Sequence, residues 1–124
     1  MEKIKILIVD DSIIYRSLLK SSLDNLDYIE VIGVASNGKI ALEKLKVQQV
    51  DLVILDLEMP EMDGITLLKK LKENQIVTKV ILFSSQTQKG ASITLEGLSL
   101  GASDFVTKPN GDHAGENPQD KIRS

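Results

Sequence analysis

The chain has 124 residues, of which 42% are hydrophobic, and a formal net charge of −3. This length fits one domain with a buried core, and the near balance of 15 basic and 18 acidic residues gives no indication of binding to nucleic acid or a membrane surface by bulk charge. Cysteine is absent, which excludes disulfides and thiolate metal sites. No signal peptide and no membrane-spanning apolar stretch occur, so we expect a cytoplasmic protein without membrane insertion.

The first two predicted elements are a strand over residues 4–9 and a helix over residues 12–25. The strand is an aliphatic run, typical of a strand buried on both faces, and Asp10 and Asp11 follow it directly. The helix has apolar residues at helical spacing, and its predicted buried stripe consists of Ile14, Leu18, Leu19, Leu23 and Leu26. Tyr15 lies off this stripe.

Strand and helix patterns alternate through the rest of the chain. The further strands are predicted over residues 30–35, 50–56, 77–83 and 104–107. The helices between them have apolar stripes on Ile40, Ala41, Leu45 and Val47, then on Ile65, Leu68 and Leu71, and then on Ala91, Thr94, Leu95 and Leu98. In the second strand, Gly33 is expected to leave room for close packing. Alternation of this kind predicts an α/β fold with a doubly wound, flavodoxin-like parallel sheet of five strands in the order 2-1-3-4-5.

In that strand order, the carboxyl ends of strands 1 and 3 are neighbours at a topological switch point, where open α/β sheets bind their ligands. Five polar residues at four strand ends converge on this crevice, namely Asp10, Asp11, Asp56, Ser84 and Lys108. Each of them has an ordinary explanation as a helix cap or a solvated strand end. Their convergence favours a functional site.

The residue types in this crevice indicate phosphoryl chemistry. Three carboxylates placed together repel one another unless a cation is bound, and oxygen ligands with few carboxylates suit Mg²⁺. The single histidine, His113, lies in a polar loop, so a zinc site is not expected. Lys108 can hold an anion as a point charge, and Ser84 can donate a hydroxyl hydrogen bond to it. These groups suit covalent phosphoryl transfer to a carboxylate.

In order and spacing, Asp10, Asp11, Asp56, Ser84 and the pair Lys108-Pro109 resemble the receiver domain of bacterial two-component response regulators, over nearly the whole chain. The resemblance implies that Asp56 is the phosphoacceptor for a histidine kinase. It implies that Ser84 contacts the phosphoryl group and that Lys108 pairs with it. In this family the bond before the corresponding proline is often cis, which sequence alone does not establish.

The same resemblance implies a magnesium site and a switch. The implied ligands of Mg²⁺ are the carboxylates of Asp10, Asp11 and Asp56 and the backbone carbonyl of Glu58, with Asp11 closer to the ion than Asp10. Ser84 and Phe105 match the family's switch positions. Phenylalanine has no hydroxyl, so any switching by Phe105 would act through packing, and a plain core aromatic is the alternative interpretation of that residue.

Residues 56–60, 84–91 and 101–109 are similar to the chemotaxis protein-glutamate methylesterases. In that family a receiver precedes a C-terminal hydrolase domain and obstructs it until the chemotaxis histidine kinase phosphorylates the receiver; the enzyme then demethylates chemoreceptors. This chain has no G-x-S-x-G motif, and His113 cannot be assigned to a triad. We therefore expect no esterase activity from the chain itself, which would catalyse only its own phosphorylation. The methylesterase domain would lie outside it.

Three other interpretations stay open at this point. The first is the receiver of a DNA-binding transcriptional regulator, against which residues 84–88 argue. The second is a dehalogenase-type phosphatase, which needs a second acid two positions after its nucleophile, where Ser12 or Ile13 stands here. The third is a phosphate-free binding module of the same fold. Residues 117–124 are predicted to be the start of a truncated fifth helix, or a linker.

Overall fold

The computed structural model describes residues 2–109, in which five strands alternate with four helices. The strands are β1 (Ile4–Val9), β2 (Ile29–Ala35), β3 (Leu52–Asp56), β4 (Lys79–Ser84) and β5 (Asp104–Thr107). The helices are α1 (Ile13–Asp24), α2 (Gly38–Val47), α3 (Gly64–Glu73) and α4 (Gln88–Ser99). None of these helices is long and apolar enough to cross a membrane. The predicted fifth helix lies outside the described residues.

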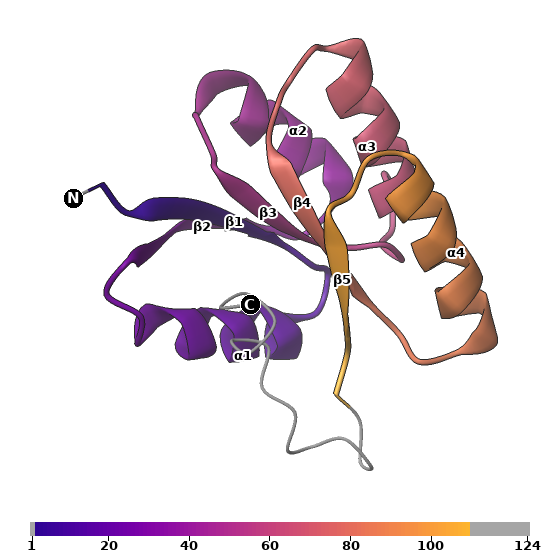
Figure 1. Cartoon of the computed structure of the whole chain (residues 1–124), viewed down its shortest axis with the longest axis horizontal. Helices are drawn as coiled ribbons and strands as arrows, with labels where there is room; N and C mark the ends of the chain where they lie inside the picture. The colour runs from indigo at the N-terminus through magenta and orange to yellow at the C-terminus, as the bar shows by residue number, and fades with distance from the viewer. Residues whose placement is uncertain (1, 110–124) are drawn as a thin grey trace.

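All neighbouring strands pair in parallel, in the order β2-β1-β3-β4-β5. The predicted fold class and strand order are therefore confirmed, and the predicted strand bounds differ from the observed ones by at most two residues. Helix α1 covers one face of the sheet, while α2, α3 and α4 cover the other (Figure 1).

Each face of the sheet has its own hydrophobic core, because successive residues of a strand point to opposite faces. The core on the α1 side consists of Ile6, Ile8, Leu19, Leu23, Leu26, Ile29, Leu52, Ile54 and Phe83. The larger core on the other side includes Leu7, Val9, Val53, Leu55, Leu67, Leu68 and Leu82. Strands β1 and β3 are thus buried on both faces, as their uninterrupted aliphatic runs predict.

The buried stripe predicted for α1 is partly wrong. Ile14 is 77% exposed and Leu18 is also exposed, whereas Tyr15 is half-buried. The side of α1 that faces the sheet therefore carries Tyr15, Leu19 and Leu23, which are four residues apart and lie on one side of a helix. The helix turns this side to the sheet because the Tyr15 ring packs edge-on against Phe83, with centroids 5.4 Å apart.

Helices α2 and α4 also differ from their predicted stripes. In α2, Leu42 is buried, while Ile40 and Val47 are exposed. In α4, Leu95 is 69% exposed, and Gly97 faces the sheet at a position where a Cβ atom would lie 2.7 Å from a methyl group of Leu82. Both corrections arise because the contact with the sheet, and not apolarity alone, selects the buried side of a helix.

Close backbone packing occurs at Gly64 and not at Gly33, where it was predicted. A Cβ atom on Gly33 would make only an ordinary contact, with Leu7 at 3.6 Å. A Cβ atom on Gly64 would lie 2.7 Å from the carbonyl oxygen of Asp56 and 2.8 Å from the Cα of Leu57. The first residue of α3 thus packs directly on the end of β3, which carries the predicted phosphoacceptor.

Candidate functional site

The site forms where β1 and β3 end side by side. These strands pair through Val9 and Leu55, and the next residue of each is an aspartate, Asp10 or Asp56. Oxygen atoms of Asp10, Asp11 and Asp56 all lie within 4.8 Å of one another. Asp10 is fully buried and Asp56 is 2% exposed, whereas Asp11 is open to solvent. The structure therefore brings together the three acids that the sequence predicts to converge.

Lys108 reaches the same crevice from the end of β5. Its Nζ atom lies 3.2 Å from Oδ1 of Asp56 and 3.5 Å from Oδ2 of Asp10, and its side chain is 15% exposed. The Lys108 amide donates a hydrogen bond of 2.7 Å to the carbonyl of Ser84, so the lysine is fixed to β4. The described residues contain no cis peptide bond, and the bond from Lys108 to Pro109 is trans.

One buried oxygen of Asp56 has no hydrogen-bond partner in the part of the chain that the structure describes. Its Oδ1 accepts a hydrogen bond of 3.1 Å from the Glu58 amide and pairs with Lys108, but its Oδ2 is buried and accepts none from the described residues. In Asp10, the Ser12 amide donates to Oδ1 at 2.8 Å, while Oδ2 has, within residues 2–109, only the ion pair with Lys108. A buried acceptor without a donor is costly, so these oxygens suit a ligand.

The donor set fits a hard divalent cation. Mg²⁺ prefers oxygen ligands, and three carboxylates lie close together here. One oxygen of Asp10 and one of Asp56 accept no hydrogen bond from the described residues. Asp11 is exposed, so water can reach the cluster. The Glu58 amide is fixed by Asp56, which places the Glu58 backbone at the rim of this cluster. That the backbone carbonyl of Glu58 binds the ion stays a prediction.

Burial is the main cause of the raised pKa values of Asp56 and Asp10, whereas the neighbouring carboxylates decide the pKa of Lys108. Burial, and next the neighbouring charge of Asp10, raise the pKa of Asp56 to about 7, while Lys108 and the Glu58 amide act in the opposite direction. Burial also raises the pKa of Asp10. For Lys108, burial acts to lower the pKa, but the neighbouring carboxylates of Asp56 and Asp10 outweigh this effect and raise the pKa of the lysine. Without a bound cation, Asp56 is therefore partly protonated near neutral pH.

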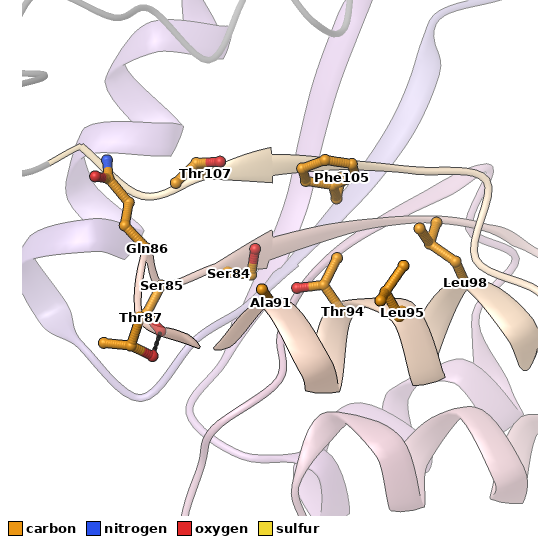
Figure 2. Close-up of a pocket in the computed structure, with 10 residues that line it drawn as sticks. All are labelled: Ser84, Ser85, Gln86, Thr87, Ala91, Thr94, Leu95, Leu98, Phe105 and Thr107. Atoms are coloured by element: carbon orange, nitrogen blue, oxygen red, sulfur yellow. Dashed lines mark hydrogen bonds between the residues drawn. The ribbon is translucent and has the colours of Figure 1, made fainter. Parts of the chain in front are cut away.

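Ser84 and Phe105 border a second hollow, on the α4 side of the sheet. The groove has a volume of about 480 Å³. Figure 2 shows it between β4, β5 and α4, with Ser84 at the end of β4 and Phe105 on β5 above Thr94. Ser84 is buried, whereas Phe105 is 39% exposed. Phe105 is thus a rim residue and not a plain core aromatic. The switch roles of both residues stay predictions.

Two residues that pack against the site were not identified from the sequence. Gly64 admits the close packing of α3 on the end of β3. The ring centroid of Tyr15 lies 4.7 Å from Nζ of Lys108. The spacing of Tyr15 four residues before Leu19 fits the buried side of α1, but the sequence alone does not select this stripe over the neighbouring one.

The fold and the acidic crevice define the class of the protein. The family model described as the response regulator receiver domain matches residues 6–115. The chain belongs to the response regulator receiver domain family, as its sequence motifs indicate.

Within this family the chain is similar to the receivers of protein-glutamate methylesterases. A protein-glutamate methylesterase/protein-glutamine glutaminase of Trichodesmium erythraeum is 50% identical over 109 residues, which are 88% of this chain and 31% of that protein. The crystal structure of the response regulator domain of Thermotoga maritima CheB has a TM-score of 0.84 at 38% identity, covering 98% of this chain and 95% of that chain. A chain of the CheX–CheY–BeF3–Mg²⁺ complex from Borrelia burgdorferi has a TM-score of 0.81 at 29% identity, covering 98% and 87%. The chain spans about a third of the length of the curated relatives it matches.

Proposed function

We propose that this chain is the phosphorylatable receiver of a chemotaxis response regulator, with Asp56 as phosphoacceptor. The observation that carries the proposal is the buried Oδ2 of Asp56, an acceptor without a donor among the described residues. It lies in a crevice with one lysine and two further acids. A carboxylate that is buried and incompletely satisfied is well placed to react with an incoming phosphoryl group.

The proposed reaction is a direct transfer from a phosphohistidine of the chemotaxis histidine kinase. A carboxylate oxygen of Asp56 forms a bond to phosphorus as the nitrogen–phosphorus bond breaks, and the electron pair stays on the imidazole nitrogen, so no further reactant is required. Lys108 pairs with the negative charge of the phosphoryl group. The hydroxyl group of Ser84 donates a hydrogen bond to a phosphoryl oxygen.

Magnesium fits this site. We assign the ion to the carboxylates of Asp10, Asp11 and Asp56 and to the carbonyl of Glu58. When bound, Mg²⁺ neutralises negative charge on the transferring group and on the acids. Support comes from the clustered carboxylates and from the similar complex of Borrelia burgdorferi, which contains both BeF3 and Mg²⁺.

Phosphorylation can be tested on the isolated chain. With Mg²⁺ and acetyl phosphate, the intact mass should increase by one phosphoryl group in the wild type but not in Asp56→Asn, because an amide is a poor nucleophile at phosphorus. Asp51→Asn is a matched control, since Asp51 lies just before β3 at the opposite edge of the sheet and is exposed. A wild type that stays unmodified, or an Asp56→Asn variant labelled at the same rate, would refute the assignment.

We further propose that the receiver regulates a methylesterase domain of the same polypeptide, which acts on chemoreceptors. The support is the 50% identity to a methylesterase about three times as long as the matched segment. A DNA-binding output is not favoured, because two relatives at 50% and 51% identity are both methylesterases. In the full-length protein, acetyl phosphate should accelerate release of methanol from methylated receptors, and Asp56→Asn should abolish the acceleration. An output domain that binds DNA and has no esterase activity would overturn this proposal.

A further inference from the structure

We propose that Tyr15 is a positioning residue that holds the ammonium group of Lys108 against Asp56 and Asp10. The inference deepens the proposed function of Asp56 and rests on it. It concerns how a lysine at the end of β5 is kept aimed at carboxylates at the ends of β1 and β3.

Two aromatic rings lie close to the ammonium group of Lys108. Its Nζ atom lies 4.7 Å from the ring centroid of Tyr15 and 5.6 Å from that of Phe83. A cation within about 6 Å of a ring centroid is attracted by the ring, most strongly where water is excluded, and the Lys108 side chain is only 15% exposed. The two rings contact each other edge to face, at an interplanar angle of 84°, so each fixes the other.

The hydroxyl group of Tyr15 provides a second connection, to the backbone beyond the lysine. It donates a hydrogen bond of 3.1 Å to the carbonyl oxygen of Pro109. The Lys108 amide is bound to the carbonyl of Ser84, and the side-chain amide of Gln86 donates to the Lys108 carbonyl at 3.0 Å. Tyr15 thus ties both the ammonium end of Lys108 and the following residue to α1.

Helix α1 is itself anchored to the acids. The Ser12 hydroxyl caps the helix by accepting a hydrogen bond from the Tyr15 amide at 3.3 Å, and the Ser12 amide donates to Asp10 Oδ1 at 2.8 Å. Arg16 adds a hydrogen bond of 2.7 Å to the carbonyl of Asp10. The residues around Tyr15 therefore connect the end of β1 to the chain that follows β5. A lysine side chain is flexible in isolation, and these contacts around Tyr15 hold the Lys108 side chain toward Asp56 and Asp10.

The test is a double-mutant cycle on the rate of phosphorylation by acetyl phosphate at saturating Mg²⁺. Tyr15→Leu keeps apolar bulk against Phe83 but removes the ring and the hydroxyl, and should slow phosphorylation by about three- to thirtyfold. Tyr15→Phe keeps the ring and should stay within about threefold of the wild type. In a Lys108→Ala background, Tyr15→Leu should cause no further slowing, because a positioning residue acts only through the group it positions. Tyr28→Leu, at a tyrosine that is 40% exposed, is the control.

A second readout does not depend on phosphorylation. In the metal-free protein, the side-chain methylene protons of Lys108 should show upfield ring-current shifts in proton–carbon correlation spectra, identified by their loss in Lys108→Ala. Tyr15→Leu should reduce these shifts by at least half, and Tyr15→Phe should retain them. Unchanged Lys108 shifts in a folded Tyr15→Leu variant, or equal slowing with and without Lys108, would overturn the proposal. If the wild type is not phosphorylated at all, the proposed function fails, while the ring-current shifts still decide whether Tyr15 positions Lys108.

Discussion

Replacing Asp56 with asparagine should stabilise the metal-free protein. The carboxylate is 2% exposed, and its Oδ2 has no donor among the residues described by the structure, so its charge is poorly solvated. Asparagine has nearly the same shape and no charge. Lys108 keeps Asp10 as a partner, at 3.5 Å, after the substitution.

The magnitude follows from the raised pKa of Asp56. A rise from 3.8 to about 7 in the folded state corresponds to at most about 4 kcal/mol, at about 1.4 kcal/mol per pH unit. Movement of Lys108 and entry of water reduce this free-energy cost of the buried charge. We therefore expect Asp56→Asn to increase the free energy of unfolding by about 2–4 kcal/mol at pH 8. For a domain of this size the gain corresponds to roughly 5–15 °C in melting temperature.

The pH dependence has a definite sign. The folded protein retains the Asp56 proton up to about pH 7, whereas the unfolded chain releases it near pH 4. Between these values the folded wild type binds more protons than the unfolded chain, so its stability falls as the pH rises. The advantage of Asp56→Asn should therefore be small near pH 4, grow up to about pH 7 and then level off.

Thermal melts of both proteins at pH 4.5 to 8.5 (about one pH unit apart, in EDTA) test this reasoning. Asp27→Asn is the control, because Asp27 is an exposed acid outside the cluster. Saturating Mg²⁺ should reduce the difference, since the ion stabilises the wild type by binding its carboxylates. If Asp56→Asn is no more stable than the wild type at pH 8, or if its advantage does not change with pH, the account of the buried charge is wrong.

Two further predictions concern the metal and the end of β3. Asp11→Ala should weaken Mg²⁺ binding in titration calorimetry and slow phosphorylation, because it removes one of few protein ligands. An equal affinity of both proteins for Mg²⁺ would show that Asp11 does not bind the ion. Gly64→Ala should lower the melting temperature by several degrees, at a cost of about 1–3 kcal/mol, because its Cβ would lie 2.7 Å from a backbone oxygen; an unchanged melting temperature would show that α3 can shift.

The convergence of the acids could be predicted from sequence because it depends on strand order alone. Asp10 and Asp56 each end an aliphatic run, and a parallel sheet places such ends at one edge whatever the details of packing. The unsatisfied state of Asp56 Oδ2 could not be predicted, because it depends on how Lys108 divides its ammonium group between two carboxylates.

The position of Tyr15 could not be fixed from sequence for a different reason. Helix α1 has apolar residues at Ile13 and Ile14 as well as at Leu19, so two neighbouring stripes fit the helical period about equally well. The choice between them is made by the contact of Tyr15 with Phe83 on β4, a residue far away in the chain.

Whether Asp56 accepts the phosphoryl group can be tested by locating the modification in the chain. The protein is treated with acetyl phosphate and Mg²⁺, reduced with borohydride, which converts an aspartyl phosphate to homoserine, and mapped by peptide mass spectrometry. We expect homoserine at position 56, and only when acetyl phosphate and Mg²⁺ are both present before the reduction. An unmodified Asp56, or homoserine at position 10 or 11 instead, would contradict this expectation.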